Sequence, residues 1–307
     1  MSAKMRVAVI GSGPQADVVA RAFADLGVLH THLGGQDAPS MMLQLDSAAV
    51  AIAVPIEDRA GLATAALKAG KHVLVTGPVA AAVSAAEVVH KEAKNSGALF
   101  VSDFASLHDA AFGALREHVR SGALGEVRKV QTSGLDLDES DPPHDVLWSL
   151  APEHVAMALA LFGDEPLFVR GSAGGIRSLA GIEECRLDLV FGETKHAHIF
   201  VSCTHPFAER RVTVVGDEAT AMLEHGAGCE ARLLSWRRVS GGDSAHEGFA
   251  EPDLLFTATA PPSPVKRLCA HFYEVAVSGS RSTTDAGSRV LRVLSRASDV
   301  LFGNNPN

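Results

Sequence analysis

The sequence predicts an α/β protein in which a Rossmann-type parallel sheet domain is followed by an α+β domain with an open, mostly antiparallel sheet. Three observations predict this fold class. Short apolar runs alternate with segments of helical periodicity over residues 5–101, a glycine-rich turn follows the first run, and alternating, β-rich segments dominate after Ala123. We expect the domains to span residues 1–123 and 124–307, with the C-terminal helix free to pack back on the first domain.

The first domain alternates strands with helices. The continuous apolar run Met5–Ile10 is typical of a parallel strand that is buried on both faces, and the residues from Gln15 to Leu26 carry apolar side chains at helical spacing. The alternation continues with the strands Ala48–Val54, His72–Thr76 and Leu99–Val101 and the helices Asp58–Ala69 and Ala82–Asn95.

The second domain is predicted to be mainly β-structure. A helix over Pro152–Phe162 interrupts it, and a helix over Arg289–Phe302 closes the chain. The stretch Ser240–Pro264 is rich in Gly, Ser, Ala, Asp and Pro, which predicts a long loop. The expected strands are Val127–Thr132, Phe168–Arg170, Arg186–Phe191, Ala197–Cys203, Arg211–Val215 and Ala221–Glu224.

Composition excludes several classes of protein. The formal net charge of -9 argues against a nucleic-acid partner and against an anionic membrane surface, because both need a concentrated positive field. No Cys-x-x-Cys pair is present, so neither a zinc site nor a disulfide framework is indicated. With no apolar stretch of membrane-spanning length and no pattern typical of a signal peptide, we expect a cytoplasmic location.

The glycine-rich turn carries the first indication of chemistry. Residues Gly11 to Ala16 match G-x-G-x-x-A between the first strand and the first helix, the pattern that brings a dinucleotide's diphosphate to a helix N-terminus. We therefore expect a present or ancestral dinucleotide site here, with a merely structural turn as the alternative. An acidic residue about twenty positions further on usually binds the ribose. Only Asp37 is acidic in that stretch, and it follows two glycines.

Several segments in the right order resemble the Gfo/Idh/MocA family of sugar and cyclitol oxidoreductases. They are VAIAVP (50–55), ALKAGKHVLVTGP (66–78), SGALGEV (121–127), VLWSLAPEHVAMALALFG (146–163), THPFAERRVTVVGDEATAMLE (204–224) and the C-terminal HFYEVAVSGSRSTTDAGSRVLRVL. The resemblance implies hydride transfer between NAD(P) and a carbon-bound oxygen, with a Lys from a Glu-Lys-Pro motif and a His as acid and base. It implies a cofactor site formed by Gly11, Gly13, Pro14, Gln15, Val54, Pro55, Thr76 and Pro78.

The catalytic positions of that family are changed in this chain. Where Glu-Lys-Pro is expected the chain has Thr-Gly-Pro, so Gly77 occupies the Lys position. Ser149 occupies the family's Asp position and Glu153 its His position. His154 follows one residue later, which turns its side chain by about 100° around a helix. Between Leu26 and Ala48 there are too few residues for two strands and a helix, so we expect cofactor binding to be weakened or lost.

Other polar groups are candidate replacements for this relay. His144, Asp145, Glu153 and His154 could form a relocated acid/base set, although each also suits a turn or a helix start. The pairs His30/His32 and His196/His198 and the acidic run from Asp136 to Asp141 lack the ligands or spacing of a metal site, so no metal is expected. Arg210 and Arg211 could meet an anionic substrate or pair with acids across the sheet.

Two hypotheses for function follow. The first is a pseudoenzyme of sugar, cyclitol or secondary metabolism that has lost the usual relay and serves in binding or scaffolding, with a sugar-like ligand or a protein partner. The alternative is an active NAD(P)-dependent oxidoreductase, lyase or isomerase that uses His144, Glu153 and His154. The resemblance implies a homodimer or homotetramer through the second-domain sheet, and the apolar strand faces at Arg186–Phe191 and Ala197–Cys203 would suit such a two-fold contact.

Overall fold

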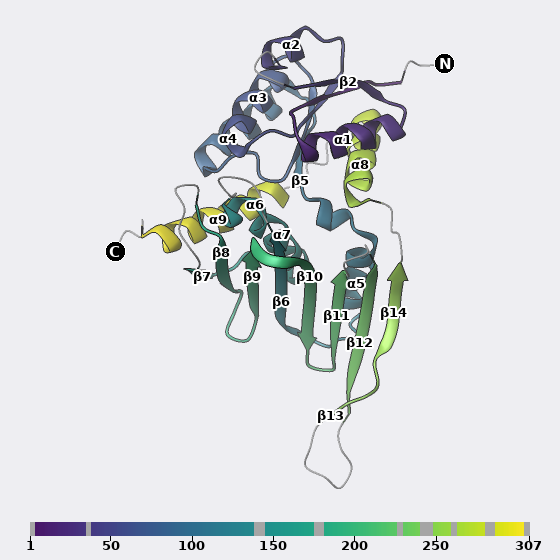
Figure 1. The fold of residues 1–307 in the computed structure, drawn as a ribbon, viewed down its shortest axis with the longest axis vertical. Coiled ribbons are helices and arrows are strands. Elements are labelled where there is room, and N and C mark those ends of the chain that lie inside the picture. Colours follow the sequence, from purple (N-terminus) through teal and green to yellow (C-terminus); the bar gives the residue numbers. More distant parts are fainter. Residues whose placement is uncertain are drawn as a thin grey trace. The chain divides into compact units, whose positions relative to one another are not determined.

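The computed structural model describes residues 4–34, 38–137, 145–174, 181–225, 230–239, 248–258, 263–279 and 286–303. The chain divides into two compact units. Unit 1 comprises Met1–His108 and Ser263–Ser295, and unit 2 comprises Asp109–Pro262 and Arg296–Asn307. Figure 1 colours both units along the sequence.

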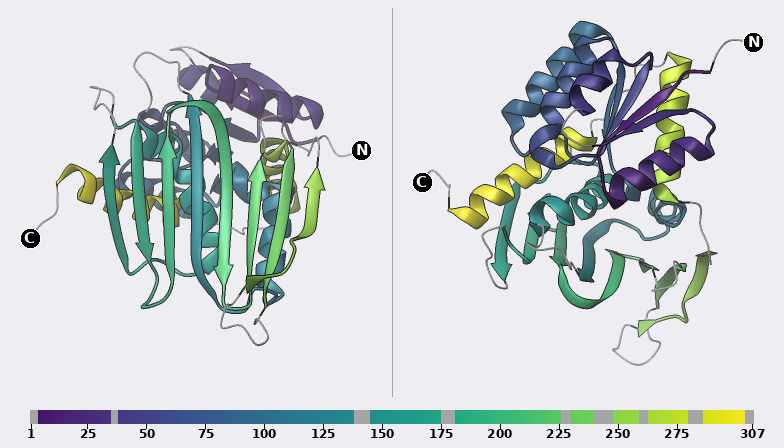
Figure 2. Two further views of the ribbon diagram at one scale, coloured as in Figure 1. Left: turned by 60° about the horizontal axis from the view of Figure 1, so that its bottom comes forward. Right: turned by 45° about the horizontal axis from the view of Figure 1, so that its top comes forward.

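Unit 1 is built on a parallel five-stranded sheet, sheet A, in the order β2-β1-β3-β4-β5. Its strands are β1 (Val7–Ile10), β2 (Leu29–Leu33), β3 (Ala49–Ile52), β4 (His72–Thr76) and β5 (Phe100–Asp103). Helices lie on both faces of the sheet, with α1 and α8 on one face and α3 and α4 on the other (Figure 2, right). The helices are α1 (Pro14–Asp25), α2 (Ala38–Gln44), α3 (Ile56–Lys68), α4 (Val83–Ser96), α8 (Pro264–Ser278) and the first part of α9 (Ala286–Phe302). The predicted parallel, doubly wound domain is confirmed.

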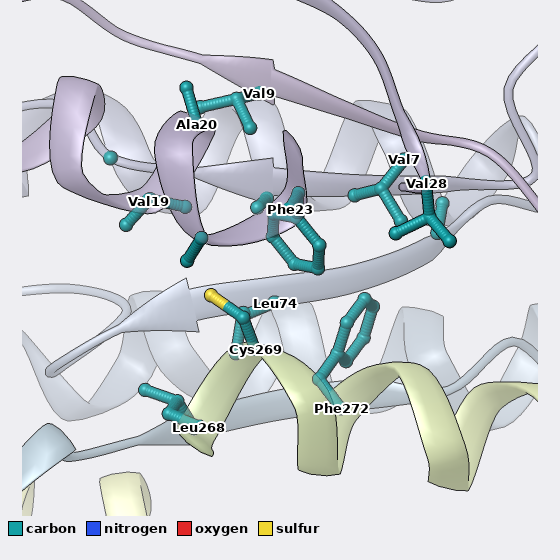
Figure 3. Close-up of a cluster of buried hydrophobic side chains, with 14 of the residues drawn as sticks. Val7, Val9, Val19, Ala20, Phe23, Val28, Leu74, Leu268, Cys269 and Phe272 are labelled. Carbon is teal, nitrogen blue, oxygen red and sulfur yellow. The ribbon is translucent and has the colours of Figure 1, made fainter. Parts of the chain in front are cut away.

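The core of unit 1 joins residues that are far apart in the sequence. Phe23 of α1 and Phe272 of α8 meet edge to face with their ring centroids 6.4 Å apart, in the same buried cluster as Leu74 of β4 (Figure 3). Both rings are fully buried, and burying one such side chain contributes about 1.5–3 kcal/mol. This packing holds α8 beside α1 and so ties the C-terminal part of the chain into unit 1.

The region between Leu26 and Ala48 holds one strand and one short helix, β2 and α2. The expectation that two strands and a helix would not fit is confirmed for the described residues. The strand is retained, however: β2 pairs in parallel with β1 and forms an edge of sheet A. The short segment therefore still supplies an edge strand to sheet A, and weakened cofactor binding stays a prediction.

Unit 2 is built on a mixed, mostly antiparallel sheet, sheet B, in the order β13-β12-β11-β10-β6-β9-β8-β7, with β14 paired to β12. The parallel pair is β6 with β9. The strands are β6 (Val127–Leu137), β7 (Phe168–Gly174), β8 (Glu184–Val190), β9 (His196–Ser202), β10 (Thr204–Gly216), β11 (Ala219–His225), β12 (Ala231–Val239), β13 (Gly248–Phe249) and β14 (Asp253–Ala258). The predicted open sheet is confirmed.

One face of sheet B is covered by helices and the other is open (Figure 2, left). The helices of unit 2 are α5 (Ala110–Arg120), α6 (Val146–Ser149) and α7 (Ala151–Phe162). The apolar residues of β8 and β9, such as Leu187, Leu189 and Ile199, are buried. They therefore belong to the core of unit 2, and the expectation that these apolar strand faces are exposed for a two-fold contact is wrong. A homodimer or homotetramer stays a prediction.

The stretch Ser240–Pro264 was expected to be a long loop, and this is wrong in part. Its described residues include the short strand β13 and the six-residue strand β14, which extends sheet B beside β12. Backbone pairing to an existing strand overrides the unfavourable local composition. Among the described helices, none is long and apolar enough to cross a membrane.

Candidate functional site

The glycine turn connects β1 to α1 at the carboxyl edge of sheet A. A Cβ atom at Gly11 would lie 2.0 Å from the carbonyl oxygen of Ala53, so only glycine lets the turn pack this closely on the end of β3. Gly13 is the N-cap of α1 with φ 86°, and a Cβ there would meet nothing within 4 Å. Pro14 begins the helix and no side chain caps it. The turn therefore presents a helix N-terminus to open space, as an anion site requires.

The other predicted cofactor residues lie at the same edge of sheet A. The amide nitrogen Nε2 of Gln15 donates a hydrogen bond to Oγ1 of Thr76 at 3.2 Å, which links the first turn of α1 to the end of β4. Parallel sheets bind ligands at the carboxyl ends of their strands. The structure places there, after β1, β3 and β4, all eight residues: Gly11, Gly13, Pro14, Gln15, Val54, Pro55, Thr76 and Pro78.

Arg59 is a member of this edge that the sequence analysis missed. Its guanidinium donates to the carbonyl oxygen of Val54 at 2.8 Å through Nε and to that of Pro78 at 2.9 Å through Nη1. Burial lowers the pKa of Arg59 to about 10, against a smaller opposite effect of Glu57, so it remains cationic at neutral pH. The side chain of Arg59 therefore holds together the segments that follow β3 and β4 and brings a positive charge to them.

Replacement of Arg59 tests this tie. We expect Arg59→Met to destabilise unit 1 by about 2 kcal/mol, because two carbonyl oxygens lose hydrogen bonds to a charged donor. Lys68→Met removes an exposed cation from the far end of the same helix and should change stability by less than about 0.5 kcal/mol. Thermal unfolding of both variants measures the difference, and equal melting temperatures would contradict the role given to Arg59.

The end of β2, where a ribose-binding acid would stand, carries a histidine. Nε2 of His32 is 3.0 Å from the carbonyl oxygen of Gly11, and Nδ1 is 4.0 Å from Oδ1 of Asp17 in the first turn of α1. The strand ends at Leu33, and Asp37 lies outside the described residues. Within the described part, imidazole rather than carboxylate therefore borders the glycine turn on this side.

The residues at the catalytic positions of the resembling family belong to both units. Gly77 follows β4 with φ 93°, a conformation that residues with a side chain rarely adopt. A Cβ atom there would lie 3.3 Å from Nη1 of Arg59, so this arginine lies beside the position of the missing Lys. In unit 2, Ser149 is exposed at the end of α6 and Glu153 is half-buried in the first turn of α7. His144 lies outside the described residues.

His154 is buried on the helix-covered face of sheet B. The side chain is 5% exposed and packs over Gly134 of β6, where an added Cβ atom would lie 2.2 Å from Nε2. Burial, and to a smaller degree the charge of Arg210, lower the pKa of His154 to about 4. The imidazole is therefore neutral at physiological pH, and its Nδ1 atom has no hydrogen-bond partner among the described residues.

Asp109 and His225 form a pair that the sequence analysis did not identify. Nε2 of His225 lies 3.2 Å from Oδ2 of Asp109, while Oδ1 of Asp109 accepts the backbone amides of Ala111 and Phe112 and so caps α5. Burial raises the pKa of Asp109, but the hydrogen bond and charge of His225 and the two amides outweigh it, so the pKa lies below its usual value. Asp109 is thus ionised and orients the ring of His225.

Several of the remaining candidates make ordinary contacts, and Asp138, Glu139 and Asp141 of the acidic run lie outside the described residues. His30 meets the hydroxyl of Ser47 at 2.6 Å, and His198 meets Asp188 at 2.6 Å on the exposed face of its strand. Asp145 caps α6 by accepting the amide of Leu147 at 2.9 Å. Over the described ranges, no group of three or more His, Cys, Asp or Glu residues is placed to hold a metal ion.

Comparison with known proteins adds the following. No protein-family model matches the chain. A dTDP-3,4-didehydro-2,6-dideoxy-alpha-D-glucose 3-reductase from Streptomyces antibioticus is 33% identical over 88 residues, which are 29% of this chain and 27% of the relative. The match thus spans about a quarter of the relative's length.

Two solved structures match almost from end to end. UDP-N-acetylglucosamine 3-dehydrogenase from Acidithiobacillus ferrooxidans has a TM-score of 0.82 at 16% identity and covers 98% of both chains. Aldose-aldose oxidoreductase from Caulobacter crescentus has a TM-score of 0.81 at 18% identity and covers 99% of both. The chain therefore has the fold of these sugar oxidoreductases. This is the fold that the resemblance to the Gfo/Idh/MocA family implied.

Proposed function

We propose that this protein is an oxidoreductase of the Gfo/Idh/MocA type that binds NAD or NADP and acts on a sugar-like substrate. The glycine turn carries the proposal: Gly11 packs against Ala53, Gly13 borders open space, and α1 has no capping side chain. These features suit a diphosphate. A bound nicotinamide cofactor would accept or donate the hydride. Gly11, Gly13 and the residues at the ends of β3 and β4 would hold it.

The sugar-like substrate is supported by the names of the similar proteins. The Streptomyces relative is named as a reductase of a dTDP-linked deoxysugar, and the two solved structures are named as enzymes of an N-acetylated sugar nucleotide and of aldoses. Each of these enzymes is named for the oxidation or reduction of a sugar. We propose the same class of substrate for this chain, without assigning a particular sugar.

The proposed reaction needs a group that exchanges a proton with the reacting hydroxyl. Gly77 has no side chain, and His154 is buried with a pKa of about 4, which makes it a poor base near pH 7. Among the described residues, His225 is better suited, because it is partly exposed and oriented by an ionised carboxylate. We propose His225 as the acid/base residue of a relocated relay; turnover by His225→Asn at the wild-type rate would exclude that role.

A second candidate function is a pseudoenzyme that binds cofactor or sugar without turnover. It is favoured by Gly77 and Ser149, which replace two residues of the family's relay. The two candidates agree on ligands and differ in chemistry. Oxidation of added sugars, followed as NADH or NADPH appearing with the purified protein, separates them, since only an oxidoreductase gives turnover.

Titration with NADH and NADPH tests the cofactor site itself. Nicotinamide fluorescence and melting temperature should both rise, because a ligand that binds the folded state stabilises it. Gly13→Ala should weaken binding at least about tenfold, since the new side chain enters the space above the turn and the backbone keeps φ 86°.

The matched control is Gly70→Ala. Gly70 also has positive φ and open space around it, but it precedes β4 at the opposite end of that strand. The substitution brings similar backbone strain without touching the carboxyl edge of the sheet, so cofactor affinity should not change. Equal loss in both variants, or no binding of either cofactor at millimolar concentration, would refute the proposed cofactor site.

A further inference from the structure

Arg210 and His225 lie side by side on the helix-covered face of sheet B. They are directly paired across β10 and β11, and Arg210 is also opposite Gly134 of β6. Alternation along β10 places Arg210 on the face of the buried Val212, and alternation along β11 places His225 on the face of the buried Leu223. Two basic side chains thus occupy the end of a face that is apolar further along the sheet.

The charge of Arg210 is not neutralised by the neighbouring acids. Glu209 accepts a hydrogen bond from the hydroxyl of Ser133 at 2.6 Å and lies 3.7 Å from Arg211. Asp109 is engaged by His225 and by the start of α5, and Glu224 is paired with Arg232. Within the described ranges, Arg210 has no hydrogen bond or ion pair. Its guanidinium is therefore available to a ligand.

The neighbour of Arg210 on the covered face is a neutral ring. His154 fills the space left by the missing side chain of Gly134, and its Nδ1 atom has no partner in the described parts of the chain. A neutral imidazole next to a guanidinium cannot cancel the positive charge, and an acid at either position would. The residue types at Gly134 and His154 thus preserve the cationic character of this end of the sheet.

A hollow of about 250 Å³ lies at this end of sheet B, and charges of both signs line it: Phe207, Ala208, Glu209, Arg210, Arg211, Glu224, His225, Glu230 and Arg232. The volume is below the ~300–1,000 Å³ typical of sites for drug-sized ligands and suits a single small molecule. Phe207 is 53% exposed and gives the hollow an apolar surface beside the charged groups. Of the acids in the lining, Glu209 is engaged by Ser133 and Arg211 and Glu224 by Arg232, whereas Arg210 is left for a ligand that carries an anionic group.

The two basic residues offer different hydrogen-bonding groups. A guanidinium binds carboxylate or phosphate oxygens in a two-pronged geometry. Because ionised Asp109 can only accept, Nε2 of His225 donates to it, and Nδ1 is left facing away from this pair as the group that can meet a hydroxyl. An anion and a hydroxyl on the same ligand would be bound together.

We propose that Arg210 and His225 form the binding site for an anionic sugar, with Arg210 on its carboxylate or phosphate group and His225 on a neighbouring hydroxyl. The inference rests on the proposed function, since it narrows the class of sugar-like substrate. It concerns residues of unit 2 alone, so it is tested without cofactor.

Calorimetric titration of the full chain, in the absence of nicotinamide cofactor, tests the site with three probes: D-glucuronate, D-glucose 6-phosphate and D-glucose. The wild-type protein should bind at least one anionic sugar, with neutral glucose at least about tenfold weaker. Preference between the carboxylate and the phosphate identifies the anion. Equal affinity for glucose, or no binding of any of the three, overturns the proposal.

Arg210→Gln should weaken the anionic sugar by about 10- to 100-fold, the loss expected for charge-assisted hydrogen bonds. Arg128→Gln is the matched control, because it removes an exposed arginine from the same sheet, where it pairs with Asp217. Unchanged affinity in Arg210→Gln, or an equal loss in both variants, overturns the assignment. If the wild-type protein binds an anionic sugar but binds neither NADH nor NADPH in a separate titration, the proposed function is refuted and the site at Arg210 and His225 is retained.

Discussion

Alanine at Gly134 should destabilise unit 2 by about 2–3 kcal/mol, the upper part of the range for overpacked cores. The new Cβ atom would lie 2.2 Å from Nε2 of His154 and within 3.0 Å of two further ring atoms. The ring is buried on a helix that packs on the sheet, so it has little room to move. Both tryptophans, Trp148 and Trp236, belong to unit 2, and their fluorescence during urea unfolding reports its stability.

The clash has a specific partner, which makes it testable by a double-mutant cycle. His154→Ala alone should destabilise unit 2 by creating a cavity. In the Gly134→Ala/His154→Ala protein the added methyl group meets no ring, so the combined loss should be smaller than the sum of the single losses by about 1–3 kcal/mol. Additive losses would show that the methyl group added at position 134 does not clash with the ring of His154.

Gly113 provides the control for the glycine substitution. It lies within α5, also in unit 2, and a Cβ atom there would meet nothing within 4 Å. Gly113→Ala should therefore stabilise the protein by about 0.5–1 kcal/mol through helix propensity alone. Destabilisation by both alanines would indicate a general intolerance of substitution instead of a contact with His154.

The sequence predicted best the elements that are buried on both faces. The strand β4 has the predicted bounds His72–Thr76, because a continuous apolar run between a glycine turn and a Thr-Gly-Pro turn has few alternatives. The edge strand β2, with sequence LHTHL, was not predicted, since its exposed positions carry polar residues and its pairing to β1 is not visible in local pattern. The strand β14 was missed because it lies in a stretch rich in Gly, Ser, Ala, Asp and Pro, and its pairing to β12 has no local signature either.

The candidate sites also differ in how far the sequence alone predicts them. The glycine turn is contiguous in sequence, so its geometry follows from six adjacent residues and could be predicted. Asp109 and His225 are 116 positions apart, and only the register of sheet B and the start of α5 bring them together. Arg59 was overlooked because its role depends on two carbonyl oxygens, which have no sequence signature. A site that forms only when distant segments of the chain come together in the fold leaves no recognisable pattern in one sequence.

The protein should lose stability on acidification through His154, over the range from about pH 6.5 down to about pH 4. The folded-state pKa of about 4 lies below the ordinary histidine pKa of 6.5. Between these values the unfolded chain binds a proton that the folded chain excludes, so stability is fully present above pH 6.5 and falls as the pH decreases. At pH 5 the loss from this residue alone should be about 2 kcal/mol.

Comparison of variants isolates this contribution, because burial also lowers the pKa of His72 and His118 and gives the wild type further loss in the same direction. The quantity to measure is the drop in the free energy of unfolding between pH 7.5 and pH 5. This drop should be about 2 kcal/mol smaller in His154→Gln than in the wild type. Arg210→Gln should reduce the difference only in part, because burial is the larger cause of the low pKa and the arginine charge the smaller. An unchanged difference in His154→Gln would mean that the ring takes up its proton in the folded state, and the neutral surroundings inferred for Arg210 would then be wrong.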